Sequence, residues 1–311
     1  MNRDYVVGVV GVDCSTTAAK AVVQNAAGGL VAQARSAFEL VQPRPGWGEQ
    51  NAEDWWAATA AAVRRALQTV DASRVAALCV THQRETFVCL DPSGHPLRPA
   101  LLWLDQGAVR EVDSYGTPDV HRITGKPPNP TPAWYKPHWL LAHEPETRQR
   151  TGKVVDVQGF LVHRLTGAWA TCWASADPLG LVDMATCDYS DDLVVAVGLS
   201  REQLPPLHPP GAVLGHVQDD VAAHLGLPAG LPVVAGVGVG DGDGQADQLG
   251  TGTGTGTITP GRTYLNLGTG VVSGIYSEEY SYGRAYRTLA AAVPGAYTLE
   301  TFIGGGTHNL N

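Results

Sequence analysis

The chain has 311 residues, of which 44% are hydrophobic and 16% are charged, so it has material for a buried core and, by its length, for two domains. Its 21 basic and 30 acidic side chains give a formal net charge of −9, which disfavours contact with nucleic-acid phosphates or anionic lipid surfaces. Nucleic acid and membrane are therefore not expected as partners. No long apolar segment or basic leader is present, so we expect a cytoplasmic protein.

The cysteines and histidines do not predict a disulfide framework or a metal centre. The five cysteines are odd in number and include no C-x-x-C pair, so we expect reduced thiols that are mostly buried. The ten histidines lack the spacing of zinc ligands, and we interpret them as scattered surface or capping residues.

The first ninety residues predict a sheet with one covering helix. Strands are expected at residues 5–13, 19–24, 30–40, 75–80 and 87–90, and a tight polar turn joins the first two. A helix is expected from Asn51, a candidate N-cap that is followed by Glu53 and Asp54 in the first turn. The polar residues 81–85 follow the strand at 75–80, where a buried strand would deliver them to a cleft.

The later elements are marked by proline and glycine. We expect a proline-rich loop at 124–137, a helix at 159–165 that ends at Gly167, and a strand at 231–239. A glycine-rich tract follows at 236–257. Strand-like segments come at 264–275, 285–293 and 296–303.

The turn within residues 13–20 (DCSTTAAK) is a candidate phosphate-binding element. Asp13 closes the first strand, hydroxyl residues occupy the turn, and Lys20 lies in the next strand. Backbone N–H groups and hydroxyls in such a turn suit phosphate oxygens, and the carboxylate can hold Mg²⁺ through water. The alternative is an ordinary hairpin turn closed by local Ser and Thr hydrogen bonds.

A second turn of the same shape lies far downstream, within residues 266–271 (NLGTGV). Two such hairpins, one opening each half of a chain, are the arrangement by which actin-like ATPases clamp a triphosphate between two related lobes.

Five segments of the sequence, taken in order, resemble motifs of the FGGY family of carbohydrate kinases. They are residues 13–20, W-G-E-Q at 47–50 with the helix start that follows it, Q-R-E-T at 83–86, L-W-L-D at 102–105 and G-D-G-Q at 242–245. Q-R-E-T is similar to the substrate-binding segment of glycerol kinases, and xylulose kinases carry Q-M-H-G at this place.

The resemblance implies an α/β chain with the actin-like ATPase (ribonuclease H-like) fold. Residues 1–255 would form a complete N-terminal, sugar-binding domain, and residues 256–311 would begin a C-terminal, nucleotide-binding domain that is cut short. The implied partners are a small-molecule sugar and ATP, with Mg²⁺ as the metal ion, and a homodimer is left open.

The resemblance also assigns roles to residues. Asp243 would accept the proton of the sugar hydroxyl, and Asp241 and Asp247 are the alternatives in the same glycine-rich loop. The implied sugar-binding residues are Gln83, Arg84, Glu85, Trp103 and Asp105. The implied phosphate-binding residues are Asp13, Ser15, Thr16, Thr17, Lys20, Gly268, Thr269 and Gly270, and Asp13 would also hold Mg²⁺ through water.

Two of these assignments have structural alternatives. Arg84 and Glu85 would bind sugar hydroxyls from an exposed cleft, or they would form an ordinary surface ion pair. Trp103 would be an apolar wall for the sugar, or a buried core tryptophan.

The sequence departs from the family pattern in three features that concern, in turn, the phosphate-binding turn, the sugar site and the adenosine site. Ser15 stands where a glycine is usual. Thr131 replaces an aromatic residue of glycerol kinases and leaves room for a larger substrate, which favours D-xylulose, although Q-R-E-T favours glycerol or another polyol. The family's later adenosine-binding loop is absent, so we expect slow phosphorylation or none; the alternative is an inactive sugar-binding fragment.

Overall fold

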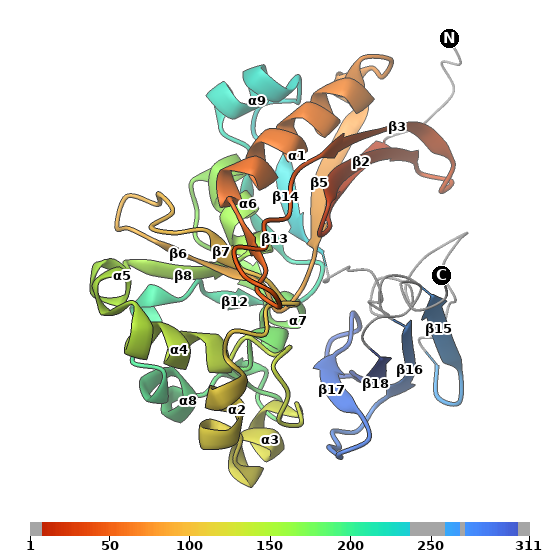
Figure 1. Cartoon of the computed structure of the whole chain (residues 1–311). Coiled ribbons are helices and arrows are strands. Elements are labelled where there is room, and N and C mark those ends of the chain that lie inside the picture. Colours follow the sequence, from red (N-terminus) through yellow and green to blue (C-terminus); the bar gives the residue numbers. More distant parts are fainter. Residues whose placement is uncertain (1–7, 237–258, 268–270, 304–311) are drawn as a thin grey trace.

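The computed structural model describes residues 8–236, 259–267 and 271–303, and its centre is a six-stranded sheet of order β13-β14-β5-β1-β2-β3 (Figure 1). Strands β1, β2 and β3 form an antiparallel meander, while β5 and β14 run parallel to β1. The strands are β1 (Gly8–Cys14), β2 (Ala18–Asn25), β3 (Leu30–Ala37), β5 (Val75–His82), β13 (Val213–His216) and β14 (Pro232–Ala235).

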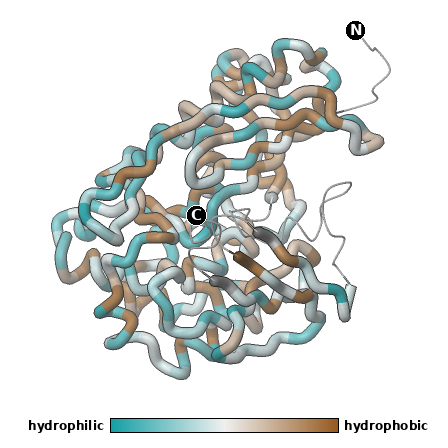
Figure 2. Tube along the Cα trace, turned by 45° about the vertical axis from the view of Figure 1, so that its right-hand side comes forward, coloured by the Kyte–Doolittle hydropathy of each residue, from teal (hydrophilic) through white to brown (hydrophobic). Residues whose placement is uncertain are grey.

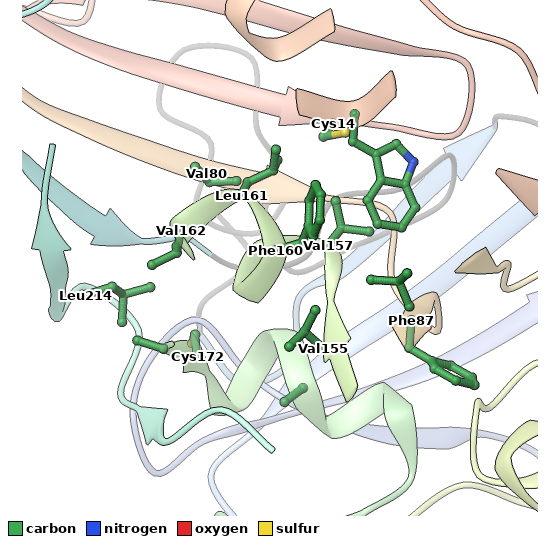
Figure 3. Packing of buried hydrophobic residues seen from close by; sticks show 14 of the residues in the cluster. Cys14, Val80, Phe87, Val155, Val157, Phe160, Leu161, Val162, Cys172 and Leu214 are labelled. Atoms are coloured by element: carbon green, nitrogen blue, oxygen red, sulfur yellow. The ribbon is translucent and has the colours of Figure 1, made fainter. Parts of the chain in front are cut away.

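Two helices cover one face of this sheet. Helix α1 (Ala52–Leu67) packs on β2 and β3, and α6 (Val157–Thr166) packs on β5, β13 and β14. Trp55 of α1 meets Phe160 of α6 edge to face, with ring centroids 5.8 Å apart. Figure 3 shows Leu161 of α6 next to Val80 of β5, so the core lies between the sheet and these two helices.

The opposite face of the sheet is more open. Along β1 the side chains of Val10, Val12 and Cys14 are buried under the helices, whereas Val9 on the other face is 44% exposed. Figure 2 shows the change between hydrophobic and hydrophilic residues along the strands. Because side chains alternate along a strand, Asp13 shares the open face with Val9.

The start of α1 agrees with the sequence prediction. The side chain of Asn51 caps the helix by accepting a hydrogen bond from the backbone N–H of Glu53 at 3.1 Å, and Glu53 and Asp54 lie in the first turn. The end of α6 also agrees, because Gly167 takes the left-handed conformation that ends the helix.

A second, smaller sheet of order β4-β7-β6-β8 lies beside the central one. Its strands are β4 (Glu49–Gln50), β6 (Phe87–Leu90), β7 (Ala100–Leu101) and β8 (Lys153–Asp156). The other short strands are β9 (Thr171–Cys172), β10 (Val182–Asp183), β11 (Asp188–Tyr189) and β12 (Leu207–His208). The remaining α-helices are α2 (Val109–Tyr115), α3 (Pro118–Thr124), α4 (Tyr135–His143), α5 (Pro145–Arg150), α7 (Trp173–Ala176), α8 (Asp191–Ala196) and α9 (Asp219–Leu225). Single 3₁₀ turns are η1 (Ala72–Arg74), η2 (Asp177–Leu179) and η3 (Arg201–Gln203).

One predicted loop is wrong at its end. Residues 124–137 were expected to form an irregular proline-rich loop, but α4 begins at Tyr135 and includes Pro137. A proline is tolerated there because the N–H groups of the first turn have no partner within the helix.

The last described elements form an antiparallel sheet, here called the C-terminal sheet, of order β15-β16-β18-β17. Its strands are β15 (Thr263–Leu267), β16 (Val271–Ser277), β17 (Arg287–Ala290) and β18 (Tyr297–Ile303). The expected segment 264–275 is thus two strands, and the segments 285–293 and 296–303 correspond to β17 and β18.

Strand β17 docks the C-terminal sheet on the rest of the molecule through its free edge. The N–H of Thr288 donates to the carbonyl of Gly125 at 2.8 Å, and the N–H of Ala290 donates to Oδ2 of Asp177 at 3.0 Å. The same Asp177 oxygen accepts from Nζ of Lys126 at 2.8 Å. An edge strand, which would otherwise present unpaired N–H groups, is satisfied by the preceding part of the chain.

Gly125 makes this docking possible, and its replacement tests it. Gly125 has a φ of +71°, and an added Cβ would lie 2.8 Å from Cβ of Thr288. Gly226, which ends α9 with a φ of +75°, has no atom within 4 Å of such a Cβ. We expect Gly226→Ala to cost about 1 kcal/mol of unfolding free energy, because it strains only the backbone.

Gly125→Ala should cost about 1–3 kcal/mol more than that control, because it also overpacks the contact with β17. Urea unfolding of the two variants and the parent chain measures the difference. An equal decrease in unfolding free energy in both variants would show that the close approach between Gly125 and Thr288 does not affect stability.

Candidate functional site

The turn between β1 and β2 is closed by local hydrogen bonds. The N–H and the hydroxyl of Ser15 both donate to the carbonyl of Ala18 at 3.0 Å. Ser15 has no positive φ, so a serine in place of glycine causes no backbone strain. Thr17 is exposed, and Nζ of Lys20 lies 3.6 Å from Oδ2 of Asp13 across the two strands.

Gln50 connects this turn to the polar segment after β5. Its amide Nε2 donates to the carbonyl of Thr16 at 2.5 Å, and its Oε1 accepts from Nε1 of Trp55 at 2.9 Å and from Nε2 of Gln83 at 2.8 Å. Gln50 is 1% exposed, so these bonds are shielded from water. The motif W-G-E-Q therefore has a physical function: its glutamine fixes the turn relative to residues 83–86.

The segment 83–86 continues from β5 along the end of β1. The N–H of Gln83 donates to the carbonyl of Cys14 at 2.9 Å. Glu85 has a φ of +53°, a conformation that a residue other than glycine adopts at a cost of about 1–3 kcal/mol. Strain of this kind concentrates at functional sites.

Arg84 and Glu85 are buried and belong to a cluster of four charges, here called the charged cluster, with Arg287 and Glu300. Arg84 is 3% exposed and Glu85 is 5% exposed. Nη1 of Arg287 donates to Oε1 of Glu85, and Nε of Arg287 donates to Oε1 of Glu300 at 2.7 Å. Nη2 of Arg84 lies 3.5 Å from the same Glu300 oxygen. The surface ion pair is therefore wrong, and so is the exposed cleft, because both residues are held by the C-terminal sheet.

The ionised state of Glu300 follows from this arrangement. Burial alone would raise the pKa of its carboxyl group, but Arg287 and Arg84 outweigh burial and hold the pKa below its ordinary value. The hydroxyl of Tyr264 donates to the second oxygen at 2.8 Å. The charged cluster therefore holds two cations and two anions.

Trp103 and Asp105 reach the same region from the loop after β7. Nε1 of Trp103, which is partly buried, donates to the hydroxyl of Thr16 at 3.0 Å. Both oxygens of Asp105 accept from backbone N–H groups, those of Gly48 at 2.8 Å and Gly107 at 2.9 Å. In this structure Asp105 fixes two loops, and its contact with a sugar stays a prediction.

A cavity of about 160 Å³ lies between the C-terminal sheet and the loop after α3. Arg287 and Glu300 line it from one side, and Lys126, Asn129 and Thr131 line it from the other. This volume is well above the roughly 10–15 Å³ that one water molecule needs, so the cavity has room for a small polar ligand.

Residues 8–250 match the model of the FGGY family of carbohydrate kinases, N-terminal domain. The chain belongs to the FGGY family.

Relatives within the FGGY family include kinases with different substrates in their names. The xylulose kinase of Escherichia coli (strain K12) is 32% identical over 229 residues, which cover 73% of this chain and 47% of that protein. A glycerol kinase of Thermococcus gammatolerans is 30% identical over 222 residues, which cover 68% of this chain and 45% of that protein. The chain spans about half the length of these relatives.

A solved structure of an FGGY xylulose kinase, from Rhodospirillum rubrum, resembles this one over nearly all of the chain. The TM-score is 0.89 at 27% identity, and the match covers 98% of this chain and 62% of that one. The predicted fold class, α/β with the actin-like ATPase (ribonuclease H-like) fold, is confirmed.

Several FGGY site residues predicted from the sequence lie outside the described residues. They are Asp243 with its alternatives Asp241 and Asp247, and the second turn, Gly268, Thr269 and Gly270. The expected boundary between residues 255 and 256 also lies outside them.

The five cysteines are free, as expected, and Cys14, Cys89 and Cys172 are buried.

Sequence reasoning missed Lys136, Arg287 and Glu300. Lys136 is 1% exposed, and its Nζ donates to the carbonyl of Leu102 at 2.7 Å. Burial lowers the pKa of Lys136 to about 8, although Asp105 and Glu85 act in the opposite direction. A lone lysine at a helix start that was expected to be a loop gives no signal for such a role.

Metal ligands do not gather in the described part of the chain. Within residues 8–236, 259–267 and 271–303, no group of three or more His, Cys, Asp or Glu side chains is arranged to hold a metal ion.

Among the described residues, no helix combines the length and the apolar character needed to cross a lipid bilayer.

The pKa of Lys136 predicts a specific dependence of stability on pH. Between pH 8 and 10.5 the unfolded chain keeps a proton on Lys136 that the folded chain has lost, so its contribution to unfolding free energy rises with pH in this window. We expect the parent chain to gain on the order of a few kcal/mol relative to Lys136→Met over this window. Below pH 8 the difference should be flat.

Urea unfolding of both proteins at pH 7 to 10.5 measures it. The titration of cysteines and other lysines cancels in the difference because both proteins share them. A difference that stays flat above pH 8 would mean that Lys136 titrates as an ordinary, solvated lysine, and a difference that falls would mean that folding raises its pKa; either result contradicts the prediction.

Proposed function

We propose that the protein is an ATP-dependent carbohydrate kinase that phosphorylates a hydroxyl group of a ketopentose, D-xylulose first. The observation that supports this most is the buried segment 83–86, which holds Glu85 in a strained conformation and joins, through Arg287, a cavity of about 160 Å³. The similarity to the xylulose kinase of Escherichia coli (strain K12) supports the choice of sugar.

In this proposal each residue keeps the role that the family motifs give it. Asp243 accepts the proton of the attacking hydroxyl, because phosphoryl transfer needs a positioned hydroxyl and a carboxylate near it. The sugar is bound by Gln83, Arg84, Glu85, Trp103 and Asp105. The phosphates lie on the turns at Ser15–Thr17 and Gly268–Gly270, next to Asp13 and Lys20. Residues 1–255 form the sugar-binding domain, and residues 256–311 begin the nucleotide-binding domain.

Asp13 has the chemistry that Mg²⁺ requires in such a site. Its carboxylate is 24% exposed at the end of β1, next to the turn and to Lys20. Mg²⁺ bound with a phosphate substrate keeps several waters and needs one or two carboxylates, so a single aspartate fits. When bound, Mg²⁺ neutralises charge on the phosphates.

There are two alternatives to this proposal. The first is that the substrate is glycerol or another polyol, which is favoured by the Q-R-E-T segment and by the similarity to the Thermococcus gammatolerans glycerol kinase. Against it, the small side chain of Thr131 leaves room in the cavity wall and favours D-xylulose. The second alternative is a chain that binds sugar without phosphorylating it.

Coupled ADP release at millimolar ATP, with D-xylulose, D-ribulose or glycerol, tests the proposal. We expect D-xylulose to raise ADP release only slowly above the sugar-free rate, and Asp243→Ala to abolish the increase. Ordinary turnover, on the order of 1–100 per second and abolished by Asp243→Ala, would overturn the expectation of slow phosphorylation and support the kinase proposal. Sugar binding by calorimetry without ADP release would favour the non-catalytic alternative. If none of the three compounds binds or reacts, the kinase assignment is wrong.

A further inference from the structure

The backbone at Glu85 needs support from outside its own segment. Glu85 has a φ of +53°, and a residue other than glycine keeps such a conformation where the surrounding structure determines it. The residues on either side are held within the first part of the chain: the N–H of Gln83 donates to the last carbonyl of β1 at 2.9 Å, and the hydroxyl of Thr86 accepts from the N–H of Trp103 at 3.1 Å. The carboxylate of Glu85 instead accepts from Nη1 of Arg287 on β17.

The guanidinium group of Arg287 is turned toward protein carboxylates on all three of its nitrogens. Nη1 donates to Glu85, Nε donates to Oε1 of Glu300 at 2.7 Å, and Nη2 lies 2.5 Å from the same Glu300 oxygen. The side chain of Arg287 is 12% exposed, whereas Arg284, which lines the same cavity, is exposed. Arg287 is therefore suited to hold other residues in place, and Arg284 is the arginine that the cavity presents to solvent.

Glu300 fixes the position of Arg287. Tyr264 on β15 and Glu300 on β18 both pair with Gly274 on β16, and the Tyr264 hydroxyl donates to Glu300 at 2.8 Å. A Cβ at Gly274 would lie 2.4 Å from that hydroxyl, so glycine leaves the space in which the hydroxyl reaches Glu300. The C-terminal sheet thus holds Arg287 by a carboxylate that is itself held, and Arg287 reaches from the sheet to Glu85.

We propose that Arg287 is a positioning residue for the sugar: it holds the Glu85 carboxylate in the orientation in which that carboxylate accepts a hydrogen bond from a sugar hydroxyl. This inference rests on the proposed function, which assigns Glu85 to the sugar. Without Arg287, Glu85 keeps a buried charge without its ion-pair partner and a strained backbone without support, so the carboxylate turns away. In this way the C-terminal sheet determines how tightly the segment 83–86 binds the sugar, because a group that is already oriented costs less to order on binding.

Titration calorimetry on the 311-residue chain tests the proposal, with whichever of D-xylulose, D-ribulose and glycerol the parent binds most tightly. Arg287→Met removes the charge and the hydrogen bonds but keeps an unbranched side chain, and it should weaken binding about 10-fold or more. Arg287→Lys keeps the charge and loses the planar fork, so its affinity should lie between those of the parent and Arg287→Met. Arg262→Met, the same change at an exposed position just before β15, is the matched control and should leave the affinity unchanged.

A double-mutant cycle shows whether Arg287 acts through Glu85. Glu85→Ala removes the carboxylate that Arg287 holds and should weaken sugar binding on its own. Adding Arg287→Met to Glu85→Ala should then weaken binding no further, within about 2-fold, because the two changes remove the same interaction. A direct contact between Arg287 and the sugar, or a displaced C-terminal sheet, would weaken binding in both backgrounds. If Arg287→Met lacks a cooperative thermal transition, Arg287→Lys takes its place in the cycle.

The possible outcomes separate this inference from the proposed function. If Arg287→Met binds the sugar as well as Arg262→Met does, or if the two losses of the cycle add, the inference is overturned and the kinase proposal stands. If Glu85→Ala leaves the affinity unchanged, Glu85 does not bind the sugar and the inference is overturned, while ADP release still decides the kinase proposal. If the parent neither binds nor phosphorylates any of the three compounds, both are overturned.

Discussion

Two charges of each sign meet in one buried volume, and the rest of the candidate site is arranged around them. Arg84 and Glu85 come from the segment after β5, and Arg287 and Glu300 come from the C-terminal sheet. A buried charge without a partner costs several kcal/mol, so neither pair of residues could stay buried if the sheet moved away. The charged cluster thus makes the placement of the C-terminal sheet a condition for the geometry of Arg84 and Glu85.

Backbone hydrogen bonds reinforce this placement at a second point. Strand β17 carries Arg287, and its next residues on the free edge, Thr288 and Ala290, bond to Gly125 and Asp177. Burial raises the pKa of Asp177, and the neighbouring Lys126 acts against that rise and favours the carboxylate. The strand that completes the charged cluster is therefore anchored at two points that follow Arg287, and side-chain and backbone contacts require the same arrangement.

Local sequence patterns predicted much of this structure, but they did not predict contacts between residues far apart in the sequence. The N-cap Asn51 and the strand–turn–strand pattern around Asp13 depend on neighbouring residues, so the sequence shows them directly. The segment at 83–86 was recognised from its motif. Its partner Arg287 is 202 residues from Glu85, and no periodicity or motif connects two positions so far apart. The exposed setting expected for Glu85 was wrong for the same reason, because the residues that bury it were not foreseen.

The hydrogen bonds of Gln50 hold the turn after β1 and the segment after β5 together without any contact from the C-terminal sheet. Through Thr16 and Gln83 this side chain joins the turn after β1 to the segment after β5, and Trp103 adds a second bond to Thr16. In the proposed reaction, the distance between a phosphate on the turn and a hydroxyl near Glu85 would then be set within residues 8–236, which suits a reaction that depends on alignment. The C-terminal sheet instead supplies Arg287 and Glu300, which line the cavity of about 160 Å³.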